Sequence, residues 1–150
     1  MSRKTVEFGK PPVRIMLIDD DPDCRMLVRD ALDETGVNFD ATEAENGADA
    51  LAVLRRGAPP DLIFLDLEMP RMDGLETLER IKSDPRLHHV PVVMMTGVDD
   101  AERINAAAEL GANSYTVKPS DGATFIDMVR QSVGYWLQVH RRPARTGTDG

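Results

Sequence analysis

The chain has 150 residues and a mass of 16.6 kDa, which is the size of one domain with short tails. Its 26 acidic and 18 basic side chains give a formal charge of −8, which argues against a nucleic-acid-binding protein with a broad basic face. The two ends hold six of the basic side chains and two of the acidic ones, so residues 13–140 carry −12. We expect a flexible tail over residues 1–12, one domain over residues 13–140, and a flexible basic tail over residues 141–150.

The sequence also bears on the cellular compartment. The single cysteine, Cys24, cannot form an internal disulfide, which suits a reducing cytoplasm. Its position on the apolar face of the first predicted helix assigns it to the core. No apolar run approaches the ~20 residues of a membrane span. The first residues, MSRKTVEFGKPP, contain no apolar signal-peptide core. We therefore expect a cytoplasmic protein that does not bind a membrane.

The first half of the chain predicts two strand–helix units. Residues 13–18 form a short apolar run that ends abruptly at Asp19. Apolar positions at helical spacing follow, and they predict a helix that begins at Pro22 and ends at Gly36. Residues 37–44 form a more polar strand, typical of a sheet edge, and a second helix follows Asn46-Gly47.

The second half predicts three more units of the same kind. Apolar runs predict strands at residues 62–65, 90–95 and 113–117. Segments of helical periodicity come after them, from about Gly74, over residues 101–110, and from Asp121 to His140. The three strands lead into Asp66, Thr96 and Lys118 respectively.

Five strands alternating with five helices favour an α/β fold, in which helices cover both faces of a parallel sheet. In such sheets a functional site forms beyond the carboxyl ends of the strands, at the switch point of the topology. The residues at these ends are Asp19, Asp20, Asp66, Thr96 and Lys118. Three carboxylates, a hydroxyl and an ammonium are therefore expected to converge.

This combination of groups favours phosphoryl transfer. Like charges packed within a few ångströms oppose ionisation, so the carboxylates of Asp19, Asp20 and Asp66 need a cation, and oxygen ligands suit Mg²⁺. A carboxylate can then attack phosphorus and form an aspartyl phosphate, while Lys118 and Thr96 supply a positive charge and a hydroxyl for the phosphoryl oxygens. The sequence contains neither a Walker-type glycine loop nor GxGxxG, so nucleotide binding is unsupported.

Four motifs carry a family resemblance when they are read together. They are Ile18–Pro22, Leu65–Pro70 with Asp73-Gly74, Met95–Gly97, and Tyr115–Pro119. In this order and spacing the chain resembles the CheY-like response-regulator receiver domains of bacterial two-component signalling, over about residues 13–137. Gly111–Tyr115 and Tyr135–Leu137 are similar to the single-domain regulators that partner phytochrome-type histidine kinases.

The resemblance implies a flavodoxin-like fold, a doubly wound five-stranded parallel sheet in the order 2-1-3-4-5 with five helices in a three-layer sandwich. It implies that Asp66 is the phosphoacceptor, which takes a phosphoryl group from a sensor histidine kinase. The implied Mg²⁺ ligands are Asp19, Asp20, Asp66 and the main-chain carbonyl of Glu68.

The resemblance also implies roles for the groups around the phosphoacceptor. Lys118 matches the lysine that pairs with the phosphoryl group, and its bond to Pro119 is expected to be cis. Thr96 and Tyr115 match a switch pair, in which the hydroxyl turns toward the phosphoryl group and the ring fills the vacated space. Glu68 stands where the family tunes attack by water, and its carboxylate can either order or repel that water. Gly97 is small and predicts a pocket open to small donors.

We expect a stand-alone response regulator, because only about ten residues follow the last helix and leave no room for an output domain. Such a protein is not an enzyme beyond its own phosphotransfer and autodephosphorylation. Its signal would pass through protein contacts of the face formed by the fourth helix, fifth strand and fifth helix. A homodimer through this face, with Tyr135 as a contact, is one expected partner; the kinase, stimulus and downstream target stay open.

Two other classes of protein are alternatives. A haloacid-dehalogenase-type phosphatase also uses an aspartate, Mg²⁺, a hydroxyl and a lysine, but it needs an acid/base aspartate two residues after its nucleophile. Here that position after Asp19 is Asp21, which is expected to cap the helix before Pro22. A pseudo-receiver that binds partners without phosphorylation would not need the intact acidic set.

His88 and His89 are expected to be surface-loop residues rather than a metal pair.

Overall fold

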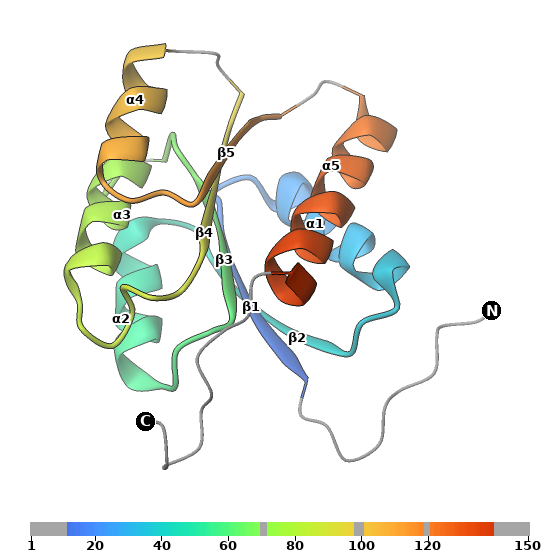
Figure 1. The fold of residues 1–150 in the computed structure, drawn as a ribbon, viewed down its shortest axis with the longest axis horizontal. Helices are drawn as coiled ribbons and strands as arrows, with labels where there is room; N and C mark the ends of the chain where they lie inside the picture. The colour runs from blue at the N-terminus through green and yellow to red at the C-terminus, as the bar shows by residue number, and fades with distance from the viewer. Residues whose placement is uncertain (1–11, 70–71, 98–100, 119–120, 140–150) are drawn as a thin grey trace.

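One parallel sheet organises the computed structural model, which describes residues 12–69, 72–97, 101–118 and 121–139 (Figure 1). Its strands run in the order β2-β1-β3-β4-β5, as the resemblance implied. They are β1 (Val13–Ile18), β2 (Phe39–Ala44), β3 (Leu62–Asp66), β4 (Val92–Thr96) and β5 (Ser114–Val117). The helices are α1 (Pro22–Thr35), α2 (Gly47–Arg56), α3 (Gly74–Ser83), α4 (Ala101–Glu109) and α5 (Gly122–Gly134).

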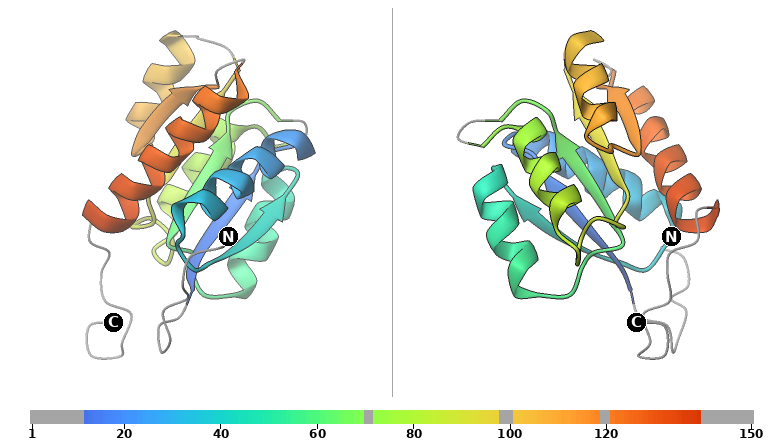
Figure 2. Two further views of the ribbon diagram at one scale, coloured as in Figure 1. Left: turned by 90° about the vertical axis from the view of Figure 1, so that its right-hand side faces the viewer. Right: turned by 60° about the vertical axis from the view of Figure 1, so that its left-hand side comes forward.

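The helices form two layers, one on each face of the sheet. Helices α2, α3 and α4 cover one face, and α1 and α5 lie together on the other (Figures 1 and 2). A separate hydrophobic cluster fills each interface, with β3 and β4 contributing alternate residues to the two clusters. This arrangement confirms the predicted doubly wound α/β fold. Among the described helices, none is long and apolar enough to cross a membrane.

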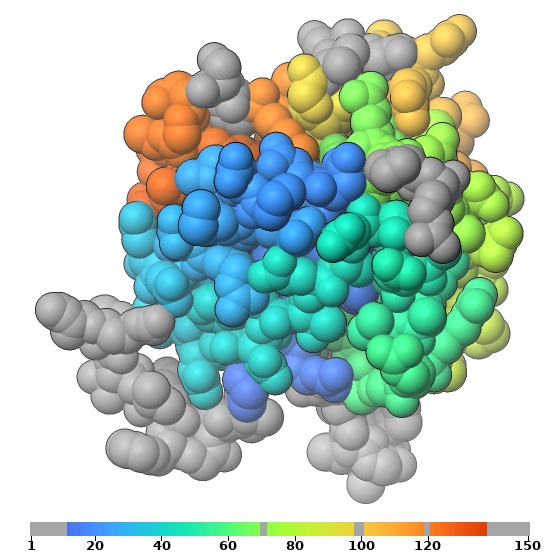
Figure 3. All heavy atoms as spheres, turned by 180° about the vertical axis from the view of Figure 1, so that it is seen from behind, coloured from blue at the N-terminus to red at the C-terminus, as the bar shows by residue number. Residues whose placement is uncertain are grey.

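The burial of each strand follows its position in the sheet. Every residue of β3 and β4 is buried, because both are central strands with helices on both faces. Strand β2 lies at the edge and exposes Asp40, Thr42 and Glu43, as its polar composition predicted. Figure 3 shows this side of the molecule, with α1, β2 and α2 coloured from blue to green.

Side-chain caps set where the helices begin. Asp21 precedes α1 and accepts from the Asp23 amide at 2.9 Å, which confirms its expected capping role. The helix ends at Gly36, whose φ of 77° lies in the left-handed region that glycine adopts readily. Asn46, Asp73 and Asp121 cap α2, α3 and α5 in the same way. The strand-to-helix loops are therefore fixed locally, close to the carboxyl edge of the sheet.

The end of the last helix differs from its prediction. Instead of one helix from Asp121 to His140, α5 ends at Gly134 and a π-helical turn, η1, covers Tyr135–Val139. Glycine favours the α-helix weakly, and the wider turn begins directly after it. Trp136 and Leu137 still pack against the α1–α5 cluster, as their spacing predicted. The Lys118–Pro119 bond and both expected tails lie outside the described residues, apart from Pro12.

Gly74 provides a test of how closely α3 packs against β3. A Cβ added to Gly74 would lie 2.4 Å from the Asp66 carbonyl oxygen and 2.6 Å from the Leu67 Cα, so backbone atoms would have to shift. We expect Gly74→Ala to lower the free energy of unfolding by about 2–4 kcal/mol in denaturant titrations. The matched control is Gly134→Ala, where the added Cβ has no described heavy atom within 4 Å outside its chain neighbours and its own helix backbone. That change should be neutral or stabilising by about 0.5–1 kcal/mol. Equal changes in stability at both positions would contradict the close packing of Gly74 against the backbone of Asp66 and Leu67.

Candidate functional site

The carboxyl ends of β1 and β3 bring three aspartates together. Ile18 pairs with Leu65 in the parallel register, so the residues that follow leave the sheet side by side. One carboxylate oxygen from each of Asp19, Asp20 and Asp66 lies within 4.8 Å of the others. Asp19 and Asp66 are buried, whereas Asp20 is exposed. The convergence predicted from the strand ends is therefore present, and it forms a set of oxygen ligands able to hold a cation.

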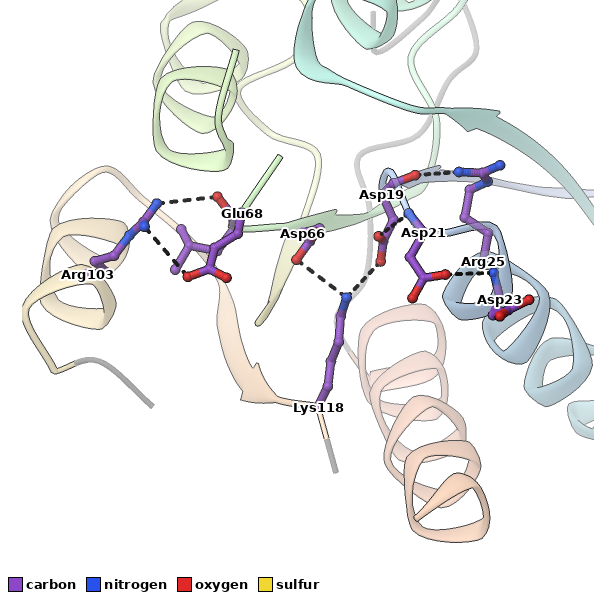
Figure 4. Close-up of polar contacts among 9 residues, drawn as sticks. Asp19, Asp21, Asp23, Arg25, Asp66, Glu68, Arg103 and Lys118 are labelled. Atoms are coloured by element: carbon purple, nitrogen blue, oxygen red, sulfur yellow. Dashed lines mark hydrogen bonds and ion pairs between the residues drawn. The ribbon is translucent and has the colours of Figure 1, made fainter. Parts of the chain in front are cut away.

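Lys118 connects the two buried carboxylates. Its Nζ lies 2.9 Å from Asp19 Oδ2 and 3.4 Å from Asp66 Oδ1 (Figure 4). The lysine follows β5, and its amide donates to the Thr96 carbonyl at the end of β4 at 2.6 Å. The pairing of β4 with β5 thus places the ammonium opposite residues that are far away in the sequence.

The electrostatics of the site depend on burial and on the neighbouring charges. Burial, followed by repulsion from Asp19, raises the pKa of Asp66 to about 7, although Lys118 acts in the opposite direction. Burial alone would lower the pKa of Lys118, but the Asp19 and Asp66 carboxylates outweigh it and raise the pKa above its ordinary value. One ammonium therefore compensates only part of the negative charge, and a further cation would favour the ionised form of Asp66.

The loop that carries Asp19 is held by a residue that sequence reasoning missed. Arg25 of α1 donates from Nη1 to the Asp19 carbonyl at 2.5 Å and from Nε to Glu43 of β2 at 2.6 Å. The Asp19 carboxylate also accepts from the Asp21 amide at 2.9 Å. Arg25 lies one helical turn after Asp21, but this spacing is shared by many helical arginines and does not by itself indicate a contact with the loop. Together these bonds orient the Asp19 carboxylate toward Lys118.

Cys24 lies in the core, as expected, and also next to the acidic group. It belongs to the α1–α5 cluster and is buried. Burial, followed by the neighbouring Asp19, raises the pKa of its thiol to about 12. The thiol is therefore protonated at neutral pH and supplies no thiolate to the site.

The two residues of the implied switch pair lie on the same side of the sheet. Thr96 is fully buried and follows Val92 and Met94 on the face covered by α2, α3 and α4. Tyr115 packs against the same cluster, with its hydroxyl shielded from solvent. Gly97 is exposed, and among the described residues other than its chain neighbours no heavy atom lies within 4 Å of a Cβ added there.

Glu68 points away from the acidic group toward α4. Its side chain is half-exposed and its Oε2 lies 3.8 Å from Nη1 of Arg103, a residue that the sequence did not single out (Figure 4). Arg103 reaches the β3–α3 loop because α4 packs beside α3. A contact that arises from this packing leaves no local sequence motif. His88 and His89 are exposed in the loop before β4, at the opposite end of that strand from Thr96, and lie apart from the acidic group.

Comparison with known proteins identifies the family. Residues 15–130 match the response regulator receiver domain, so the chain belongs to this family of two-component signalling proteins. The chain is 38% identical over 112 residues to the chemotaxis protein CheY-3 of Vibrio cholerae, an alignment that covers 75% of this chain and 85% of CheY-3. It is 31% identical over 142 residues to the response regulator Rcp1 of a Synechocystis species, covering 91% and 97% of the two chains.

Solved structures agree with this assignment. The phosphorylated cyanobacterial phytochrome response regulator RcpA has a TM-score of 0.85 at 30% identity, with coverage of 89% of this chain and all of RcpA. The Mn²⁺-bound form of Rcp1 has a TM-score of 0.83, also at 30% identity and with the same coverage. The resemblance predicted from the four motifs, including the similarity to phytochrome-associated regulators, is thus confirmed at the level of family and fold.

The raised pKa of Asp66 makes the stability of the metal-free protein depend on pH. Between about pH 4 and 7 the folded protein holds a proton at Asp66 that the unfolded chain releases, so this contribution to stability is lost as the pH rises through 7. In chelator at pH 8, we expect Asp66→Asn to be more stable than the wild type by about 1–3 kcal/mol. The difference should shrink toward pH 4 in thermal or denaturant unfolding.

The control is Asp30→Asn, which changes an exposed carboxylate of α1. It should produce no pH-dependent difference of this size. A stability difference between Asp66→Asn and the wild type that stays constant from pH 4 to 8 would contradict the raised pKa of Asp66.

Proposed function

We propose that this protein is a response regulator that accepts a phosphoryl group on Asp66 from a sensor histidine kinase. The observation that carries the proposal is the shared contact of one ammonium with two buried carboxylates, Lys118 with Asp19 and Asp66. Response regulators interact with histidine kinases, and this chain belongs to their receiver family. The similarity to Rcp1 and to the phytochrome response regulator RcpA favours a phytochrome-type kinase as the donor.

In the proposed reaction a carboxylate oxygen of Asp66 attacks the phosphorus of the kinase phosphohistidine. The new P–O bond forms as the P–N bond breaks, and the imidazole leaves with the bonding electron pair and takes up a proton. Lys118 lies within reach of the Asp66 carboxylate and neutralises charge on the transferred group. The Thr96 hydroxyl is proposed to donate to a phosphoryl oxygen, and Tyr115 to change its packing in response.

A divalent cation is part of this proposal, with Mg²⁺ as the physiological ion. Asp19, Asp20 and Asp66 would hold it with the main-chain carbonyl of Glu68, because three clustered carboxylates and a raised Asp66 pKa fit a site for a hard cation. The Mn²⁺-bound form of Rcp1 supports a divalent ion in a similar protein. When bound, the cation supplies charge neutralisation for the phosphoryl oxygens.

The output is proposed to be protein contact rather than enzymatic turnover, apart from self-catalysed phosphotransfer and autodephosphorylation. The proposed contact face consists of α4, β5 and α5, which surround Tyr115. Val117 of β5 and Tyr135 of η1, directly after α5, are exposed large hydrophobic residues and the proposed contacts. We place the protein in the cytoplasm, without a membrane or nucleic-acid partner, and we place its receiver domain over residues 13–140.

Incubation with acetyl phosphate and Mg²⁺ tests the phosphoacceptor directly. We expect intact mass spectrometry to show one labile phosphoryl adduct on the wild type, with none on Asp66→Asn or in excess chelator. Lys118→Ala should slow adduct formation by at least about tenfold, because the transferred charge loses its partner. Asp30→Asn should be phosphorylated like the wild type.

The two rival classes of protein predict different outcomes of the same experiment. Steady turnover of a phosphate ester without a retained adduct would support a phosphatase. No adduct from acetyl phosphate, and none from a cognate kinase, would support a pseudo-receiver and contradict the proposal.

The proposed contact face predicts a homodimer that depends on Tyr135. This side chain is 53% exposed and its ring lies edge-on to that of Trp136, with centroids 4.8 Å apart. Tyr135→Ala should weaken the dimer by about tenfold in Kd, measured by sedimentation with and without phosphorylation. Met26→Ala is the matched control, since Met26 is equally exposed but lies on α1. A protein that stays monomeric at high micromolar concentration in both states would contradict this prediction.

A further inference from the structure

Arg103 contacts three described residues of the segment that follows Asp66. Its Nη2 lies 3.4 Å from the Leu67 carbonyl oxygen and 3.8 Å from Asp73 Oδ2, and its Nη1 lies 3.8 Å from Glu68 Oε2. The arginine comes from α4, whereas its three partners belong to the loop between β3 and α3. A single guanidinium therefore holds the residues next to the proposed phosphoacceptor from outside their own loop.

The Glu68 carboxylate points toward this guanidinium. Figure 4 shows the Glu68 side chain directed toward Arg103, while the Asp66 carboxylate is directed toward Lys118. Glu68 is two residues from Asp66 and carries a fourth negative charge beside the three clustered aspartates. If it were released, its carboxylate could turn toward the open side of the site and add its charge there.

Asp73 has less freedom than Glu68. Its Oδ1 accepts from the Glu76 amide at 3.0 Å as the cap of α3, so its carboxylate stays in place without Arg103. Within the described residues, the Glu68 carboxylate accepts no such bond from its own loop. Arg103 therefore acts on the charge near Asp66 mainly through Glu68.

Phosphodonors approach this site as anions, so charge near Asp66 affects the rate of phosphotransfer. Resting on the proposed function, we infer that Arg103 is a positioning residue that keeps the Glu68 carboxylate turned toward α4 and offsets its charge against an incoming anionic phosphodonor. Arg103 and Glu68 are both partly exposed, and at 3.8 Å the pair is not a tight hydrogen-bonded bridge. Solvent screens such a pair, so a moderate effect on rate is expected, with little effect on stability.

The test compares initial rates of phosphorylation by acetyl phosphate at saturating Mg²⁺ and low ionic strength. We expect Arg103→Ala to slow adduct formation about three- to tenfold, and the deficit should shrink at high salt. Arg103→Lys keeps the charge and should restore most of the rate. In a Glu68→Gln background, Arg103→Ala should change the rate less than about twofold, because no Glu68 charge remains to be held.

Arg80→Ala is the matched control. It removes an arginine paired with Glu76 on the exposed surface of α3, with 3.0 Å between Nη2 and Oε2, and should leave the rate unchanged. Equal rates for the wild type and Arg103→Ala would overturn the inference, as would a deficit that persists fully with Gln at position 68. Thermal unfolding of each variant separates these results from loss of fold. Absence of any adduct on the wild type is a different outcome, which refutes the proposed function and the inference with it.

Discussion

One lysine ammonium lies between two buried carboxylates, and the chemistry of the site depends on this unequal charge balance. Lys118 contacts Asp19 and Asp66, yet the pKa of Asp66 still rises to about 7 because burial and Asp19 oppose its ionisation. A nucleophilic carboxylate must be ionised, so a second cation favours the reactive form. The same imbalance that costs stability in the metal-free protein therefore makes the proposed site responsive to a divalent ion. It also makes any neighbouring charge, including that of Glu68, relevant to the rate of the proposed phosphotransfer to Asp66.

The sheet provides the rigid edge on which this balance is built. Strands β3 and β4 are buried on both faces, so their carboxyl ends cannot move without disturbing two hydrophobic clusters. Asp66 ends one of these strands and Thr96 the other. Gly74 then lets α3 begin in direct contact with the backbone of Asp66 and Leu67. The site is consequently held by main-chain packing on one side and by charged side chains on the other.

Two arginines extend this support beyond the residues of the motifs. Arg25 holds the Asp19 carbonyl and joins α1 to Glu43 of the edge strand. Arg103 holds the segment after Asp66 from α4. The loops that carry the acidic residues are thus each contacted by a cation from a helix. Because α4 also forms part of the proposed contact face, Arg103 connects the loop beside the proposed phosphoacceptor to that face.

The sequence by itself determined the order of the elements, the sheet topology through the family resemblance, and the aspartates and lysine at the strand ends. These features are readable because hydrophobic periodicity, caps and strand-terminal residues are local patterns, and parallel strands place their carboxyl ends at one edge. The sequence did not indicate the π-helical turn after Gly134 or the parts played by Arg25 and Arg103. Arg103 meets Leu67 across 36 positions of the chain, a contact that no local pattern specifies. Only the tertiary structure decided which arginines of the helices reach the site, because their reach depends on how the helices pack on the sheet.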